Sequence, residues 1–342
     1  MTDLTDQHIG TPPPLFAASL LYLIAFVGTA SLVIGLGQGI ESGLVRFVAA
    51  LIFAGGGTVL ALALSQTALA TILGRGLHLW QFVWCIGIGV LLWLPATWIL
   101  YVATYGLTVG VGALATPQPL TDAARPAIVA LQLGVIVPLC QGIFMWGFFQ
   151  SAAGRLGRGR GAILAAFLFG LFGLVATEFG MAAIPAWWLV GGFAAYTSYA
   201  TRSAWGGIAL AGGWGAVRPL IERTQAEFDL FYWLGGERQN DPGQLFEGRW
   251  LLAAAFLGFL AFAALQVIRV LNSPDIGSQT TSAKNPPQKS VWWLPLAAAF
   301  VFTIFLGYGE ISLRALNNLR PQPIPDGTTT IPPLAPTEAP PP

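Results

Sequence analysis

Long apolar segments that carry almost no charge constrain this chain more than any other feature. A helix needs about 20 mostly apolar residues to cross a bilayer, and it satisfies its own backbone hydrogen bonds there. The chain of 342 residues is 55% hydrophobic and only 9% charged, which is too apolar for a soluble domain. The sequence therefore predicts an all-α fold, a polytopic transmembrane helical bundle with about eight to nine spans.

Nine apolar segments have about the length of a membrane span. They lie at about 15–36, 44–64, 79–105, 126–150, 162–179, 184–202, 203–220, 250–271 and 291–311. Pro95 lies within the third segment and is expected to kink it. The Gly-, Pro- and Thr-rich stretch 106–124 is typical of an extramembrane loop.

These segments divide the chain into six parts. They are a polar N-terminal arm (1–14), N-terminal transmembrane helices (15–123), a transmembrane core (124–220), an extramembrane amphipathic segment and loop (221–249), a C-terminal transmembrane pair (250–312) and a Pro-rich disordered tail (313–342). Between Val217 and Phe231, apolar and polar residues fall on opposite faces at helical spacing. This pattern predicts one amphipathic helix in the membrane interface.

The short loops indicate an orientation. The loop after the fourth span carries Arg155, Arg158 and Arg160, and most acidic residues lie on the odd-numbered loops, although Lys and Arg are about equally numerous on the two sides. The N-terminal arm has no Lys or Arg, so the first span is expected to be retained rather than cleaved. We expect an integral protein of a bacterial plasma membrane, or of an internal membrane derived from it, with a cytoplasmic N-terminus and the C-terminus outside.

The stretch from Pro138 to Gly173 contains one apolar span, the arginine-bearing turn and the start of a second span. This layout resembles the CPBP family, the Abi-like CAAX-processing and bacteriocin-processing intramembrane proteases. In that family a Glu-Glu-x-x-x-Arg helix is followed by a basic turn and a Phe-x-x-x-His helix, and a third helix carries His and Asn four residues apart. The resemblance covers about residues 124–220 and rests on the order of the spans, the basic turn, Gly147, Phe169 and Trp205.

The polar residues that define the family are missing from this frame. With Gly147 in register, the Glu pair corresponds to Gln141 and Gly142, and the family's Arg, Phe, first His, second His and Asn correspond to Trp146, Phe169, Gly173, Ala211 and Gly215. A shift by one residue places Cys140 and Gln141 under the Glu pair, again without a carboxylate. The resemblance therefore implies a degenerate member that lacks the catalytic residues.

Few reactive side chains remain elsewhere. The two histidines, His8 and His78, lie outside the motif helices, and the two cysteines, Cys85 and Cys140, lie in apolar runs where a disulfide is not favoured. General-base catalysis needs a proton acceptor, and zinc needs His, Cys or carboxylate ligands. We therefore expect no catalytic residue, no metal site and no cofactor.

Two polar residues within the spans are possible functional residues. Glu178 lies near the end of the fifth span, where an ionisable group is a functional candidate, although it can also simply reach water. Gln141 is expected to form a hydrogen bond across the emptied pocket, worth about 0.5 to 1.7 kcal/mol. Glu310 and Arg314 have the i,i+4 spacing of an interface ion pair.

These features favour a non-catalytic, CPBP-like integral membrane protein that acts as a scaffold, assembly factor or accessory subunit of a membrane protein complex. Its expected partners are the lipid bilayer and other integral membrane proteins, contacted through the segment from Val217 to Phe231 and through Gly-rich helix faces at Gly206, Gly207, Gly212 and Gly213. A net charge of +1 argues against nucleic acid. Two alternatives stay open, a CPBP-type intramembrane endopeptidase with an atypical site and a small-molecule transporter.

Overall fold

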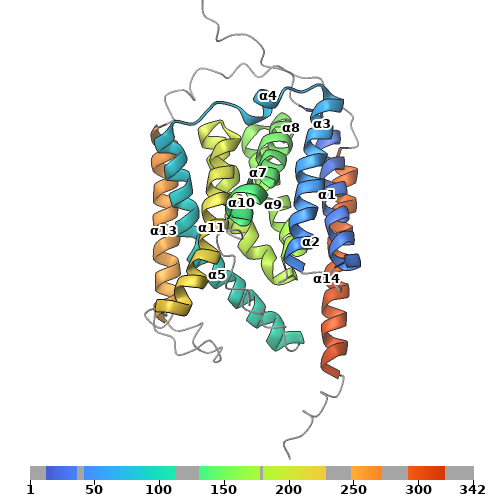
Figure 1. Ribbon diagram of the computed structural model, residues 1–342. Helices are drawn as coiled ribbons and strands as arrows, with labels where there is room; N and C mark the ends of the chain where they lie inside the picture. The colour runs from blue at the N-terminus through green and yellow to red at the C-terminus, as the bar shows by residue number, and fades with distance from the viewer. Residues whose placement is uncertain are drawn as a thin grey trace, which may run out of the picture.

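The computed structural model describes residues 13–36, 42–111, 131–177, 180–228, 248–271 and 292–319. Figure 1 shows a bundle in which most of the long helices run side by side. Within the described ranges there is no strand, only an isolated antiparallel bridge between Gly74 and Ser203. The predicted all-α class is confirmed.

Seven described segments are long and apolar enough to cross a membrane. They are Leu15–Leu36, Leu44–Ser65, Leu79–Thr104, Gln132–Leu156, Arg158–Ala176, Leu251–Leu271 and Trp293–Ser312. Helices α10 (Ala183–Thr201) and α11 (Ala204–Phe228) occupy the sixth and seventh predicted places but are not among the seven. Their Gly, Trp, Tyr and Thr residues lower the mean hydropathy, so the structure supports seven candidate spans and not the predicted eight to nine.

The N-terminal third forms three spans. Their elements are α1 (Leu15–Leu36), then α2 (Ser42–Ala49), the π-helix η1 (Ala50–Gly56) and α3 (Gly57–Ser65), then the short α4 (Leu69–Leu73), and finally α5 (Leu79–Val111). The second half of α5 turns away from the bundle (Figure 1). Pro95 lies inside this helix, and the bend follows because proline removes one backbone hydrogen bond and clashes with the preceding turn.

The fourth span and the three helices after it form the centre of the bundle. The span is a succession of the π-helix η2 (Gln132–Ile136), α7 (Val137–Gly142), the π-helix η3 (Ile143–Phe149), α8 (Gln150–Ala153) and the short η4 (Gly154–Leu156). Gly157 then reverses the chain with φ of 107°, α9 (Arg158–Ala176) follows, and η5 (Gly180–Ala182) leads into α10. The apolar stretch of α9 is 61% buried, more than any other candidate span.

The last two helices, α13 (Gly248–Leu271) and α14 (Trp293–Leu319), lie at the periphery, and each is only 22% buried over its apolar stretch. Helix α13 packs on α5, and at this interface the indole Nε1 of Trp84 donates a hydrogen bond of 3.1 Å to the carbonyl of Ala264. Helix α14 packs on α1, where the rings of Phe26 and Phe302 meet edge to face at 6.1 Å.

Tyr22 ties α1 to the central helices. Its fully buried hydroxyl donates a hydrogen bond of 2.8 Å to the carbonyl of Leu168 in α9. Aromatic rings surround it at centroid distances between 6.0 and 6.5 Å, namely those of Phe26, Phe144, Phe149 and Phe172. This packing joins α1, η3 and α9 into one core.

Three helices run further than the sequence predicted. Helix α5 continues to Val111, into the predicted loop 106–124, and α14 continues to Leu319, into the predicted tail 313–342. Helix α11 continues to Phe228 without a break, so the predicted interfacial helix is a continuation of the seventh segment, and its last residues lie outside the described part. The extension of α14 contains the good helix formers Leu and Arg, whereas the extension of α5 contains two Gly, so helix propensity does not account for all three cases.

Candidate functional site

The three motif segments meet at the centre of the bundle. The ring of Trp146 in η3 lies 5.2 Å from Phe169 of α9, which lies 4.7 Å from Trp187 of α10. Trp187 meets Trp214 of α11 edge to face at 5.7 Å. We call Trp146, Phe169, Trp187 and Trp214 the aromatic column. Two of the predicted motif positions, Trp146 and Phe169, are therefore packing residues in direct contact.

Three other motif positions are glycines without room for a side chain. A Cβ atom on Gly142 would overlap Ile208 of α11, and one on Gly215 would overlap the carbonyl oxygen of Leu133 in η2. A Cβ atom on Gly173 would lie 2.7 Å from the indole Cγ of Trp187, where real Cβ contacts essentially never fall below 3.0 Å. The carboxylate, imidazole and amide of the family frame would not fit between these helices.

Gln141 lies beside the aromatic column and is 7% exposed. It lines a small void together with Phe144, Met145, Phe169 and Phe172, and this void leaves no volume in which the centre of a water molecule fits. No hydrogen bond joins its side chain to any described residue, so the predicted bond across the pocket is not formed. Ala211 is also buried, at 5% exposed.

The two acidic candidates have different outcomes. Glu178 lies outside the described residues. The carboxylate of Glu310 accepts a hydrogen bond of 3.0 Å from the backbone N–H of Met181 in η5. Gly180 permits this approach, because it has φ of 58° and a Cβ atom there would overlap the carboxylate. Glu310 thus ties α14 to the turn before α10, and its pairing with Arg314 stays a prediction.

Metal-binding side chains do not gather within the described ranges. No group of three or more His, Cys, Asp or Glu residues there could hold a metal ion. The backbone N–H of His78 donates a hydrogen bond of 3.1 Å to Gln81 at the start of α5, whereas His8 lies outside the described part. Cys85 and Cys140 are free thiols, buried and half-buried respectively.

The predicted Gly-rich faces of α11 are used inside the chain. Gly206 faces Thr197 and Thr201 of α10, and Gly207 faces Ser198 and Trp146. A Cβ atom on Gly212 would lie 2.6 Å from the carbonyl oxygen of Gly134, and one on Gly213 would overlap that of Ile86. Small residues do permit close helix contact here, but the contact is intramolecular. These four glycines are therefore not a surface for a partner helix, which corrects that prediction.

Several polar contacts between helices were not foreseen from the sequence. Gln150 donates a hydrogen bond of 3.0 Å to the carbonyl of Ala195, and Ser198 accepts one of 3.0 Å from the N–H of Gly207.

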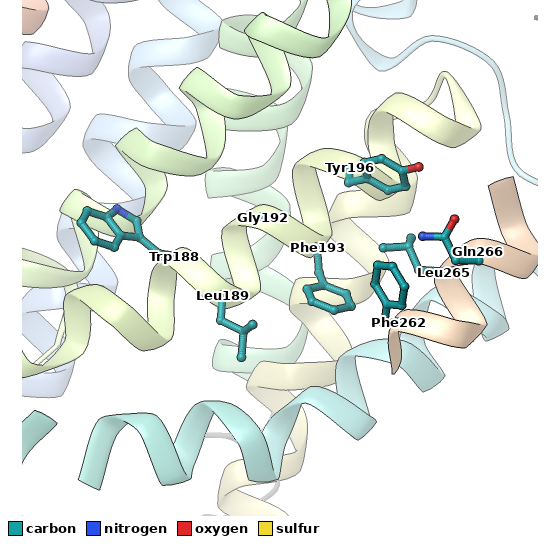
Figure 2. Close-up of a pocket in the computed structure, with 8 residues that line it drawn as sticks. All are labelled: Trp188, Leu189, Gly192, Phe193, Tyr196, Phe262, Leu265 and Gln266. Atoms are coloured by element: carbon teal, nitrogen blue, oxygen red, sulfur yellow. The ribbon is translucent and has the colours of Figure 1, made fainter. Parts of the chain in front are cut away.

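Figure 2 shows a groove between α10 and α13, with a volume of about 350 Å³. Its lining residues are Trp188, Leu189, Gly192, Phe193, Tyr196, Phe262, Leu265 and Gln266. In the sequence, the groove could have been suspected only from Gln266, a polar amide within an apolar span.

The described part of the chain is all helical, and seven of its segments are long and apolar enough to cross a membrane around a core rich in aromatic side chains. No family model matches the chain, and neither do curated proteins or solved structures.

Proposed function

We propose that this chain is a non-catalytic membrane protein that acts as a scaffold, assembly factor or accessory subunit of a membrane protein complex. The observation that carries the proposal is the closed centre, where the void beside Gln141 admits no water. Hydrolysis of a peptide bond needs a water molecule and a group that takes its proton. Among the described residues, the motif positions at this centre carry no carboxylate or imidazole, and the void beside Gln141 has no room for a water molecule.

The resemblance to the CPBP frame fits this proposal, because packing residues stand at the positions of the family's catalytic residues. Gly142, Gly173 and Gly215 stand where the family has Glu, His and Asn, and each touches a neighbouring helix too closely for a side chain. Restoring one catalytic residue would therefore also require the helices to separate. This closure favours the non-catalytic proposal over an endopeptidase with an atypical site.

The peripheral helices offer the surface for a partner. Large apolar side chains are exposed along α13, including Leu252 (70%), Phe256 (61%) and Phe259 (65%). Helix α14 exposes Phe305 and Tyr308 in the same way. In a membrane these faces contact lipid or the helices of another protein. They take the place of the Gly-rich faces as the proposed docking surface.

We further propose a bacterial plasma membrane, or an internal membrane derived from it, as the location, with a cytoplasmic N-terminus. Six of the described arginines lie at one end of the bundle, where α4, η4, α10 and α13 end and α9 begins, whereas Arg46 of α2 lies toward the other end. The six are Arg75, Arg155, Arg158, Arg160, Arg202 and Arg269. Basic loops favour the cytoplasmic side. Tyr22 contacts Leu168 and Phe26 contacts Phe172, so α1 runs parallel to α9 and begins at this basic end.

Affinity purification from native membranes in mild detergent, followed by mass spectrometry, tests the proposal. A defined stoichiometric set of membrane proteins is expected to co-purify. Isolation of a lone monomer would contradict it. A parallel assay on membrane-embedded peptide substrates should show no cleavage, and cleavage that disappears in a Gln141→Ala variant would point to the peptidase instead.

A further inference from the structure

The groove between α10 and α13 is open to the surroundings of the bundle. Phe262 on one wall is 51% exposed and Trp188 at one end is 41% exposed. Gly192 lies in the floor, and no atom lies within 4 Å of the position its Cβ would take. The groove is therefore unfilled space on the outer surface of the bundle, along the candidate span α13.

Fixed neighbours hold the groove open. Helix α13 is held against α5 by the hydrogen bond from Trp84 to Ala264 and by the contact of Gly258 with Pro95. At the far end of the groove, the Nε1 of Trp188 donates a hydrogen bond of 2.9 Å to the carbonyl of Phe167. These contacts fix both walls, so the gap does not depend on loose side chains.

One end of the groove is polar. Figure 2 shows Tyr196 and Gln266 on facing walls at this end, with apolar side chains along the rest. Within the described part of the chain, neither the Tyr196 hydroxyl nor the Gln266 amide makes a hydrogen bond. An amide without a partner in an apolar span is costly. The pair is therefore suited to hydrogen-bond a polar group of a ligand.

The polar end also lies toward the basic end of the bundle. Arg269 is exposed and follows Gln266 by about one helical turn on α13. Tyr199 is 38% exposed and its ring lies 5.9 Å from that of Tyr196, as expected for aromatic residues at the membrane surface. The groove thus runs from the level of lipid headgroups toward the middle of the bilayer.

The dimensions fit one hydrocarbon chain. From Trp188 to Tyr196 the helix rises roughly 12 Å, close to the ~15 Å thickness of one hydrocarbon leaflet. The groove has a volume of about 350 Å³ and is lined mostly by apolar and aromatic side chains, as suits an acyl chain.

We propose that this groove binds one molecule of an anionic phospholipid. One acyl chain lies along Gly192 between the aromatic walls, Tyr196 and Gln266 hydrogen-bond the ester region, and Arg269 pairs with the phosphate. The site is independent of the proposed scaffold function, because it depends only on described residues of α10 and α13.

Native mass spectrometry of the full, delipidated chain tests the site, with phosphatidylglycerol and phosphatidylcholine of identical acyl chains as probes. The wild-type chain should bind one phosphatidylglycerol in preference to phosphatidylcholine. Gly192→Leu fills the floor of the groove and should abolish this binding. Gly87→Leu is the matched control, because Gly87 also has no atom within 4 Å of its Cβ position but lies on α5, and it should bind as the wild type does.

Two further variants test the headgroup end without touching the floor. Arg269→Gln should lower the preference for phosphatidylglycerol about fivefold, as expected for one arginine near an anionic headgroup. Gln266→Leu should weaken the binding of both lipids. Unchanged binding in Gly192→Leu, equal binding of both lipids by the wild type, or a peptide helix retained in place of lipid would each overturn the proposal.

Discussion

Single glycines determine how closely the central helices approach one another. Gly89 of α5 lies under the carbonyl of Leu210 in α11, and Gly215 of α11 lies under that of Leu133 in η2. A methyl group at either position would meet backbone, which moves only with its whole helix. Gly147 differs, since a Cβ atom there would lie at least 3.5 Å from its nearest neighbour, Ile72.

Gly215→Ala should therefore destabilise the protein by about 1–3 kcal/mol, the usual cost of overpacking a core. Gly147→Ala is the matched control on a neighbouring motif helix, and it should be neutral or stabilising by up to about 1 kcal/mol. The free energy of unfolding measured by SDS titration in detergent distinguishes the two. Equal effects of both substitutions would show that the approach of α11 to η2 is not tight.

The order of the central helices could be predicted from the sequence, but the filling of the space between them could not. Phe169, Gly147 and the arginine turn give the order of the motif helices in the sequence. The filling of the pocket depends on Trp187, which lies outside the motif segments, and on Ile208, which lies on the third motif helix at a position without a motif residue. Contacts between distant segments have no periodicity that a single sequence can show.

Secondary-structure elements show a second limit of sequence reasoning. The π-helices η1, η2 and η3 interrupt two of the spans, and η3 covers most of the first motif segment. An ordinary helical spacing assigns wrong faces across such a turn, because each π-turn holds more residues. The predicted positions of the spans along the chain stay correct after such a shift, whereas the predicted inward and outward faces of the helices do not. Gln141 lies in α7, before η3, and it does face the central void as the sequence predicted.

Helix α14 contacts the turn before α10 through the Glu310 carboxylate and through the packing of Gly307 against Met181. Glu310→Leu leaves the N–H of Met181 without this acceptor, which should cost about 1–3 kcal/mol of stability. Glu310→Gln keeps an acceptor oxygen and should cost less. Hydrogen exchange at the Met181 amide, followed by mass spectrometry, should be faster in the Leu variant than in the Gln variant. Similar exchange in both would exclude Glu310 as the tie.

At the scale of the whole molecule, α14 and α1 run in the same direction. Phe302 of α14 contacts Phe26 of α1, and Glu310 contacts the turn that follows α9. Both helices therefore begin at the arginine-bearing end. With the N-terminus in the cytoplasm, as we propose, the described end of α14 is expected outside.

Cysteine labelling checks this orientation. In a chain with Cys85→Ala and Cys140→Ala, a Ser312→Cys variant should react with a membrane-impermeant maleimide on intact cells. A Gly159→Cys variant, placed in the arginine turn, should react only after the cells are permeabilised. The opposite pattern would invert the orientation, and labelling of both on intact cells would contradict a crossing by α14.

The contact between Gly89 and Leu210 also has a consequence for biosynthesis. About 120 residues separate these two contact points, and translation at roughly 5–20 residues per second takes about 6–24 s to cover that distance. Helix α5 is therefore complete before its partner α11 has been made, and Gly89 is expected to lack its final contact while α9 and α10 are being synthesised. The central packing can form only once α11 has been added, and α13 and α14 follow it.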